Sequence, residues 1–369
     1  MAADRDDRGN DRGLGPLAAR VPPVIRAAAP YHVPVPPQLV AKLDANELPY
    51  GLPPDLRARL GAVLAKVALE RYPDPAARAL RAAVAESHAE HAITPEQIVF
   101  GNGSDELIAM LCAAFAGASP SAPAAVLYPV PSFVYYRIAA VTRGLPMIEV
   151  PTGPRFELDE AAISRAVAEH HPGVVFLALP NNPTGTLWRM GFALELAARH
   201  PDVVIVSDEA YCAYSGATNL AHLAAHPNLV VLRTLSKIGL AGLRVGYALA
   251  APALASLLEV VRPPYNLSAI DQAAAAFCLR EASAWCAARA ADVVLERGHL
   301  ATALAARGLD VLPSAANLLL VRFADAPTTY RRLADAGISV RTFGAGRLSD
   351  YLRITVGTPA ESAALLAAL

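Results

Sequence analysis

Short apolar runs alternate with segments of helical pattern from residue 97 to residue 250, and this alternation constrains the fold more than any other feature. Runs that are apolar almost throughout are typical of strands buried on both faces of a sheet. Their alternation with helices predicts right-handed crossovers and a mostly parallel seven-stranded sheet covered by helices, that is, an α/β fold. In such sheets ligands bind outside the carboxyl ends of the strands. The strand candidates are residues 97–100, 124–128, 146–150, 174–179, 203–207, 229–233 and 245–250.

The remaining segments predict a second, smaller unit. Two Ala-rich helical patterns, 54–70 and 75–91, precede the alternation and belong to a large domain of residues 53–265. After residue 265 a long helical region is followed by three strand candidates with helices between them, which predicts an α+β domain over residues 266–369. These candidates are residues 317–323, 338–341 and 351–356.

The N-terminal segment differs from both units in composition. Residues 1–20 are charged and polar, and we expect them to form a disordered tail. Residues 21–52 begin with a proline-rich stretch. Because proline fixes φ and removes a backbone donor, we expect this arm to lie extended over another surface and to complete the small domain.

Composition argues against several functional classes. The net charge is −1, so we expect no broad basic face for nucleic acid. No uncharged apolar run approaches the ~20 residues of a membrane span, and the first residues lack the apolar core of a secretion signal. The cysteines have no metal-type spacing, which argues against a metal site and favours a reducing, cytoplasmic location. They are Cys112, Cys212, Cys278 and Cys286.

Lys237 is one of three lysines in a chain whose basic residues are otherwise arginines, and it lies in the Gly-rich apolar segment LRTLSKIGLAGLRVGY. A desolvated lysine has a lowered pKa and can form a Schiff base with a carbonyl compound, whereas arginine keeps its proton. A loop lysine that reaches solvent is the alternative. The neighbours Ser236 and Arg244 favour a reactive amine, because together they could hold a phosphate beside it.

Three further motifs follow strand candidates. GNGSDE opens a helix where Ser104 and free backbone N–H groups could bind a phosphate; a plain helix cap at Ser104 is the alternative. The motif lacks the third glycine of the dinucleotide fingerprint, which argues against a nicotinamide enzyme. Asp208 in DEAY could pair with a protonated pyridine nitrogen, cap a helix or bind an arginine. Asn182 in the turn NNPTG could donate to a phenolate oxygen.

Eight motifs in a fixed order carry a resemblance to a known family. RYPDP, GNGSDE, YPVPSF, NNPTG, DEAY, TLSK, LAGLRVG and LRITVG together resemble the fold-type I pyridoxal-phosphate aminotransferases, and among them the histidinol-phosphate aminotransferases. The resemblance extends from about Tyr31 to the C-terminus. It implies a homodimer that uses pyridoxal 5′-phosphate in histidine biosynthesis. The implied reaction interconverts L-histidinol phosphate and 2-oxoglutarate with imidazole acetol phosphate and L-glutamate.

The resemblance also implies roles around the cofactor. Lys237 matches the lysine that binds the cofactor covalently, and Asp208 matches the acid that keeps its pyridine nitrogen protonated. Asn182 and Tyr211 match the groups that bond its phenolic oxygen, and Phe133 matches the aromatic ring that stacks on it. The residues that match the phosphate site are Gly103, Ser104, Asp105, Ser236 and Arg244, with Tyr72 of the partner subunit.

The implied substrate residues are fewer. Arg353 in YLRITVG matches the arginine that binds the anionic end of the substrate, and its planar guanidinium suits a carboxylate or a phosphate. Arg341 matches a second arginine near the phosphate, with a surface charge on an edge strand as the alternative. Tyr31 matches a tyrosine that covers the substrate, and Asn182 is assigned to the substrate as well as to the cofactor.

Other functions remain possible for such a chain. An aromatic amino-acid aminotransferase or a threonine-phosphate decarboxylase would share the motifs around the cofactor. A noncatalytic, cofactor-sensing regulatory module is normally fused to a DNA-binding domain, for which the short polar N-terminus leaves no room. Asn317 and Tyr265 lie in family-like segments, and we expect a packing role for each.

Overall fold

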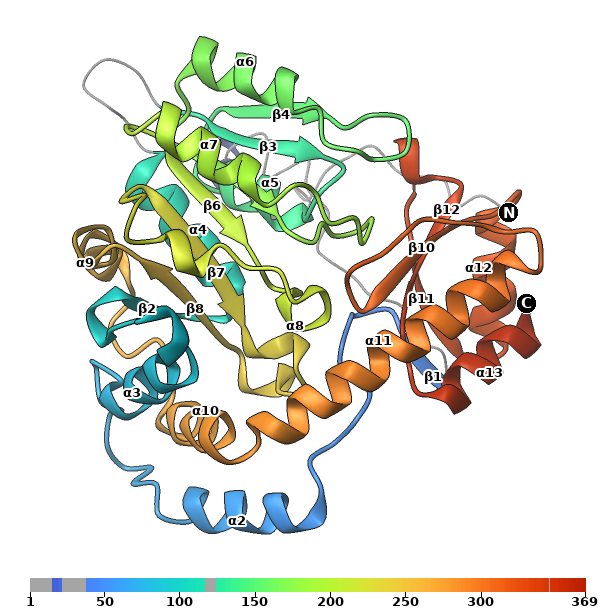
Figure 1. Ribbon diagram of the computed structural model, residues 1–369, viewed down its shortest axis with the longest axis horizontal. Helices are drawn as coiled ribbons and strands as arrows, with labels where there is room; N and C mark the ends of the chain where they lie inside the picture. The colour runs from blue at the N-terminus through green and yellow to red at the C-terminus, as the bar shows by residue number, and fades with distance from the viewer. Residues whose placement is uncertain (1–14, 22–37, 117–123, 345) are drawn as a thin grey trace.

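The computed structural model describes residues 15–21, 38–116, 124–344 and 346–369, which include two sheet-based units (Figure 1). The large unit has a seven-stranded sheet in the order β2-β8-β7-β6-β5-β3-β4. Its strands are β2 (Ile98–Asn102), β3 (Val126–Val130), β4 (Met147–Pro151), β5 (Val174–Ala178), β6 (Val204–Asp208), β7 (Leu229–Thr234) and β8 (Val245–Ala250). Each lies within two residues of a predicted strand, so the α/β prediction is confirmed.

The strand directions in the large sheet bring the strand ends next to the predicted site residues to one edge of the sheet. β8 runs antiparallel to its neighbours β2 and β7, and the other neighbouring pairs are parallel. The amino end of β8 therefore lies at the same edge as the carboxyl ends of the other strands. Along β5, Val174 and Phe176 face one core and Val175 and Leu177 face the other. This double burial, worth ~1.5–3 kcal/mol for each such side chain, explains why the strands are apolar throughout.

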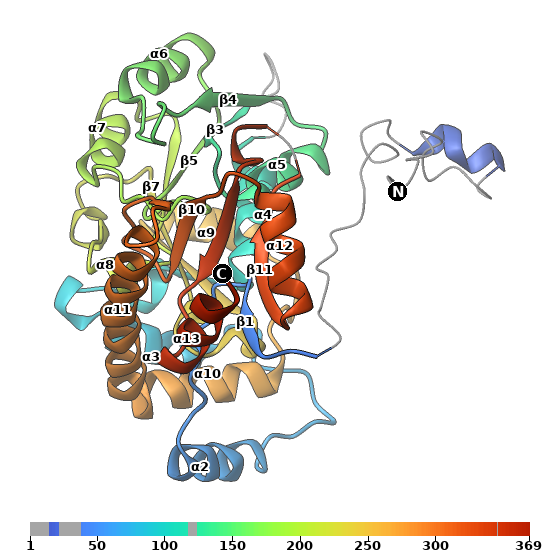
Figure 2. The same cartoon turned by 90° about the vertical axis from the view of Figure 1, so that its right-hand side faces the viewer.

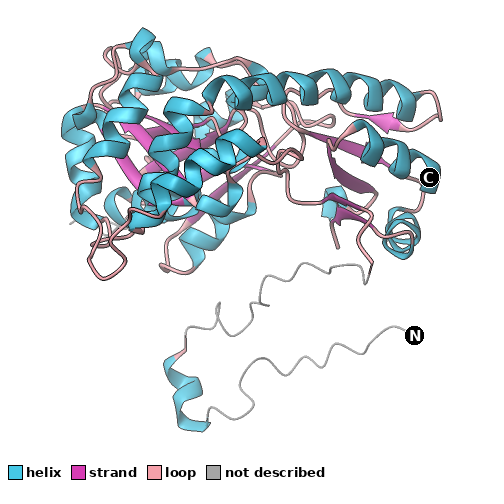
Figure 3. Cartoon of the chain, turned by 90° about the horizontal axis from the view of Figure 1, so that it is seen from below, coloured by secondary structure: helices cyan, strands magenta, loops and turns pink. Residues whose placement is uncertain are grey.

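Helices cover both faces of the large sheet (Figure 3). They are α2 (Pro54–Leu64), α3 (Arg78–Ser87), α4 (Gly103–Phe115), α5 (Val134–Val141), α6 (Glu160–His170), α7 (Gly191–Arg199), α8 (Cys212–Ser215), α9 (Pro252–Val261) and α10 (Ala269–Glu281). Helices α4, α5 and α9 bury their apolar side chains in the core that contains Phe176. Helices α2, α3, α6, α7 and α10 contribute to the opposite core. Helices α2 and α3 are shorter than the predicted 54–70 and 75–91.

The small unit has a five-stranded sheet in the order β1-β11-β12-β10-β9, and α-helices pack beside it (Figure 2). Its strands are β1 (Ala41–Leu43), β9 (Asp310–Val311), β10 (Leu318–Arg322), β11 (Ile338–Thr342) and β12 (Tyr351–Thr355). Its helices are α11 (Ser283–Ala305), α12 (Ala326–Asp335) and α13 (Pro359–Ala368). The three predicted strands are confirmed. The short strands β1 and β9 were not predicted, and β1 joins the N-terminal arm to the sheet by parallel pairing with β11.

The packing of α10 bears on the domain boundary. Ala275, Ala276 and Cys278 of this helix lie in the core of the large sheet, whereas α11 continues from the large unit to the small one (Figure 1). We therefore propose a boundary near Ser283 instead of residue 266. Short 3-10 helices complete the described chain: η1 (Gly15–Arg20), η2 (Ala89–His91), η3 (Pro95–Gln97), η4 (Leu220–His222), η5 (Leu235–Lys237), η6 (Ala241–Leu243) and η7 (Gly346–Leu348). Within the described residues, no helix is both long and apolar enough to cross a lipid bilayer.

Candidate active site

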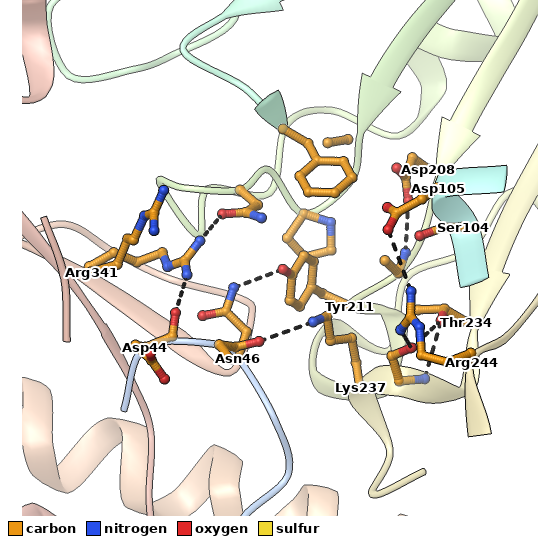
Figure 4. Close-up of a pocket in the computed structure, with 18 of the residues that line it drawn as sticks. Asp44, Asn46, Ser104, Asp105, Asp208, Tyr211, Thr234, Lys237, Arg244 and Arg341 are labelled. Atoms are coloured by element: carbon orange, nitrogen blue, oxygen red, sulfur yellow. Dashed lines mark hydrogen bonds and ion pairs between the residues drawn. The ribbon is translucent and has the colours of Figure 1, made fainter. Parts of the chain in front are cut away.

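A cavity of about 440 Å³ lies at the carboxyl edge of the large sheet, between that sheet and the small unit. Its lining comes from the strand ends of the large sheet, from the residues after β1, and from β11 and β12 (Figure 4). Most of the predicted site residues line it together. These are Ser104, Asp105, Phe133, Asn182, Asp208, Tyr211, Ser236, Lys237, Arg244, Arg341 and Arg353.

One end of the cavity is suited to an anion. Gly103, Ser104 and Asp105 form the first turn of α4, and the guanidinium of Arg244 lies against that turn, with Nη2 3.4 Å from Asp105 Oδ2. Arg244 Nη1 also donates to Ser236 Oγ at 3.3 Å. Gly103 has a φ of +76°, and a Cβ there would lie 2.6 Å from Arg244 Nη2, so this position requires glycine. Backbone N–H groups, hydroxyls and a guanidinium thus converge on one place.

The position of Ser104 decides whether it acts as a helix cap. Helix α4 begins at Gly103 and Asn102 occupies the cap position, so the interpretation of Ser104 as a helix cap is wrong. Ser104 lies in the first helical turn, where its hydroxyl faces the same cavity as the guanidinium of Arg244.

Asp208 is the buried last residue of β6. Its Oδ2 accepts a hydrogen bond from the Tyr136 hydroxyl at 2.6 Å, and its Oδ1 accepts one from the Ala210 N–H at 3.2 Å. Burial raises the pKa of Asp208 to about 6, while these two hydrogen bonds act in the opposite direction. An unspecified arginine was an alternative partner for Asp208; Arg233 of the neighbouring strand β7 pairs with Glu209 instead, with its Nη2 2.9 Å from Glu209 Oε2.

Lys237 ends the short helix η5, directly after β7. Its Nζ donates to the carbonyl oxygen of Ala45 at 3.2 Å and lies 5.8 Å from the centre of the Tyr211 ring. Burial, with the positive charge of Arg353 as a further cause, lowers the pKa of Lys237 to about 8. The amine therefore lies in the cavity, and a substantial fraction of it is neutral in mildly alkaline solution.

Two arginines define the other end of the cavity. Arg341 on β11 and Arg353 on β12 are opposite each other in the antiparallel register, so both side chains project from the same face of the small sheet. Arg353 donates to Asn182 Oδ1 at 2.7 Å and to the carbonyl oxygen of Asp44. Because β11 lies between β1 and β12, the alternative that placed Arg341 on an edge strand is wrong. Figure 4 shows Arg341 and Asp44 across the cavity from Arg244.

Residues after β1 close the cavity, and the sequence had not indicated them. Asn46 has a φ of +55°, its Nδ2 donates to the Tyr211 hydroxyl at 2.8 Å, and its backbone N–H donates to Thr355 Oγ1 at 2.9 Å. The amide of Asn317 donates to the carbonyl oxygen of Asn46 at 2.9 Å, which agrees with the packing role expected for it. The clue in the sequence was an asparagine in an arm that was expected to be extended, since asparagine tolerates positive φ.

Comparison with known proteins identifies the family. The profile described as "Aminotransferase class I and II" matches residues 39–369. The chain belongs to the class I and II aminotransferases. Histidinol-phosphate aminotransferase 2 of Cupriavidus pinatubonensis is 43% identical to it over 351 residues, which cover 93% of this chain and 94% of that protein.

Solved structures agree with this assignment. The crystal structure of histidinol-phosphate aminotransferase from Sinorhizobium meliloti in complex with pyridoxal 5′-phosphate superposes with a TM-score of 0.81 and 26% identity, over 95% of this chain and 96% of that one. L-threonine-O-3-phosphate decarboxylase from Porphyromonas gingivalis superposes with a TM-score of 0.76 at 24% identity, over 89% and 98% of the two chains. The second likeness concerns the fold, which both proteins share with this aminotransferase.

Besides Gly103, which lies in the first turn of α4, the predicted site residue Tyr72 of this aminotransferase is absent from the cavity lining described above. The Tyr72 side chain is 82% exposed and stacks on Tyr265, with ring centres 4.6 Å apart and planes at 21°. The stacking agrees with a packing role for Tyr265. Tyr31 lies outside the described residues.

Tyr136 is a second residue that sequence reasoning missed. It follows Phe133 by three positions, and its hydroxyl reaches Asp208 from α5. The spacing places both rings on one side of the helix start, which was a usable clue. Its partner, 72 positions away, was not evident from the sequence.

Proposed function

We propose that this aminotransferase uses pyridoxal 5′-phosphate to interconvert L-histidinol phosphate and 2-oxoglutarate with imidazole acetol phosphate and L-glutamate. The observation that carries the proposal is a single cavity with a cradle for one anion at one end, two arginines in register at the other, and a reactive amine between them. The 43% identity to a histidinol-phosphate aminotransferase over nearly the whole of both chains supports the choice of substrate.

The hydrogen-bond donors of the cavity fit the cofactor. Ser104, Ser236 and Arg244, with the N–H groups of the first turn of α4, bind its phosphate. Phe133 would stack on its ring, as the position of Phe133 in the cavity lining allows. The Oδ1 of Asn182 is turned toward Arg353, so its amide N–H groups point elsewhere and suit the phenolic oxygen.

The catalytic groups then follow from charge and geometry. When bound, the cofactor supplies an electron-withdrawing ring that takes up the charge left on the substrate carbon. Asp208 holds the proton on the ring nitrogen, which a buried carboxylate does well because the ring cation neutralises it. Lys237 Nζ, neutral in part at working pH, removes the proton from the substrate carbon and returns one during transfer of the amino group. Tyr211 donates to the phenolic oxygen while Asn46 holds its hydroxyl.

The substrate anion binds at the arginine end. Arg353 forms paired hydrogen bonds with the carboxylate of glutamate in one half-reaction and with the anionic end of histidinol phosphate in the other. Arg341 faces the same cavity and adds positive charge for a phosphate. One pair of guanidinium groups therefore serves two substrates whose common features are the amino group that is transferred and an anionic end.

We further propose that the enzyme acts as a homodimer in the cytoplasm. The exposed Tyr72 ring, held by stacking on Tyr265, supports a role in the cavity of a second copy, where its hydroxyl would reach the cofactor phosphate. The free thiols of all four cysteines support a reducing compartment. Sedimentation of the purified protein with bound cofactor tests the dimer, which a monomeric active enzyme would contradict.

A half-reaction tests the function most directly. Histidinol phosphate is added to the cofactor-loaded protein, and the cofactor absorbance is followed; it should bleach, and 2-oxoglutarate should restore it. Borohydride reduction followed by peptide mapping should place the cofactor on Lys237. Release of carbon dioxide from threonine phosphate, or faster bleaching by phenylalanine than by histidinol phosphate, would instead identify one of the alternative enzymes.

A further inference from the structure

We propose that Tyr136 is a positioning residue for Asp208: its hydroxyl orients the carboxylate and holds it in the charged form that pairs with the ring nitrogen of the cofactor. The proposal rests on the proposed cofactor and adds a residue to its site. Tyr136 itself does not line the cavity, because it lies behind Asp208 and is fully buried.

The Tyr136 ring is fixed from two sides. It stacks on Phe176 of β5, with ring centres 4.6 Å apart and planes at 11°. It also meets Phe133 edge to face, with centres 5.7 Å apart and planes at 89°. Both arrangements are favourable for aromatic pairs. The hydroxyl is therefore held in one place relative to the end of β6, and the same ring supports Phe133, which faces the cavity.

The hydrogen bond has the length of a charge-assisted one. Tyr136 Oη lies 2.6 Å from Asp208 Oδ2, within the range typical of a hydroxyl that donates to a carboxylate. Burial and the nearby negative charge hold the pKa of Tyr136 well above its usual range, so the hydroxyl remains protonated and acts as donor. Asp208 is therefore the acceptor, which favours its ionised form.

The other surroundings of Asp208 oppose its charge. Burial raises its pKa, and the carboxylates of Asp105 and Glu209 raise it further. The hydrogen bonds from Tyr136 and from the Ala210 N–H counter these effects. Without the Tyr136 hydroxyl, protonated Asp208 becomes more stable and its Oδ2 loses its fixed donor. A carboxylate that is less often charged and less well oriented binds a ring cation more weakly.

The test compares two tyrosines of the same core. Tyr136→Phe keeps the ring and removes the hydroxyl. Tyr128→Phe is the matched control, since its ring centre is 6.0 Å from that of Tyr136, but its hydroxyl donates to Glu149 at 2.7 Å. The cofactor-free proteins are titrated with pyridoxal 5′-phosphate and with an analogue whose ring nitrogen is replaced by carbon. Thermal unfolding of each variant is recorded alongside.

We expect Tyr136→Phe to weaken binding of pyridoxal 5′-phosphate by about tenfold or more, the usual effect of losing one hydrogen bond to a charged group. Affinity for the carbon analogue should stay within about twofold, because that ring carries no cation for Asp208. Tyr128→Phe should leave the affinity for both compounds unchanged. Equal losses with the two compounds, or equal effects of the two variants, would overturn the proposal, since each indicates a packing effect.

A second measurement uses the Asp208→Asn background. If Tyr136 acts through the charge of Asp208, Tyr136→Phe should add no further loss of cofactor affinity there, whereas additive losses contradict the proposal. Failure of the proposed function is distinguishable: wild-type protein would then take up no cofactor on Lys237. A wild-type protein labelled at Lys237, with Tyr136→Phe behaving as Tyr128→Phe does, would reject the role of Tyr136 and leave the function in place.

Discussion

The two ends of the cavity are built in different ways. The anion cradle and the amine come from strand ends of one sheet: the first turn of α4, the end of β6 and the helix η5. The arginine end joins three parts of the chain, because Arg353 of the small sheet bonds Asn182 of the large unit and Asp44 of the arm. Backbone pairing between strands sets the geometry of the cradle end. The geometry of the arginine end depends on how separate segments of the chain pack together.

This difference predicts different responses to substitution. Backbone ladders fix the strand ends, so a change at the cradle end should alter chemistry and cofactor binding with little effect on how the units pack. Contacts at the arginine end connect residues 171 and 309 positions apart. A change there should alter substrate affinity and leave the cofactor in place. The following variants test that separation.

Lys237→Ala should have the largest effect. In the proposed mechanism, loss of the amine removes both the covalent attachment and the proton carrier, so turnover should fall by more than ~10³-fold. Cofactor binding should weaken but persist, because the phosphate cradle is unchanged. Steady-state transamination and cofactor absorbance measure the two effects. The control is Lys66→Ala, a change at an exposed lysine of the α2 region, which should behave as wild type. Substantial turnover by Lys237→Ala would refute its assignment.

Arg353→Ala should have the next largest effect. Loss of the paired hydrogen bonds should lower kcat/KM by about a hundredfold for glutamate and for histidinol phosphate together, because in the proposed mechanism both present an anion to this residue. The dissociation constant of the cofactor should change by no more than about threefold. Arg322→Ala, which removes an exposed arginine of β10, is the matched control. A loss confined to one of the two substrates would show that they do not share Arg353.

The same difference explains what could be predicted from the sequence. Ser104, Asp208 and Lys237 each stand next to a recognisable strand, and the rule that ligands bind at carboxyl strand ends brings them together without knowledge of the packing. Asn46 and Tyr136 depend on partners 165 and 72 positions away, and no local pattern specifies those contacts. Sequence reasoning therefore recovers the cradle end more completely than the side-chain contacts that support both ends.

The shortest strands were not predicted from the sequence, for a related reason. Strand β1 has three residues and β9 has two, too few to establish a period of two. β1 forms by parallel pairing with β11, a tertiary contact that no local pattern specifies. The prolines before it predict an extended arm, but they do not indicate where the arm pairs.

Asn46 offers the finest test of the comparison, with the smallest expected effect. Asn46→Ala and Asn46→Gly both remove the hydrogen bond to Tyr211 and should raise KM for both substrates about threefold to tenfold, the loss of about one hydrogen bond. They differ in the backbone, because a φ of +55° is strained for alanine and easy for glycine.

Asn46→Ala should therefore unfold at lower temperature than Asn46→Gly, with a free energy of unfolding ~1 kcal/mol smaller, while the two variants share one KM. Equal stability with different KM values would mean that the arm acts through its backbone path instead of the Asn46 amide. If both variants lost as much affinity for the cofactor as for the substrates, the arm would contribute to the cradle end as well. The two ends of the cavity would then not be separable.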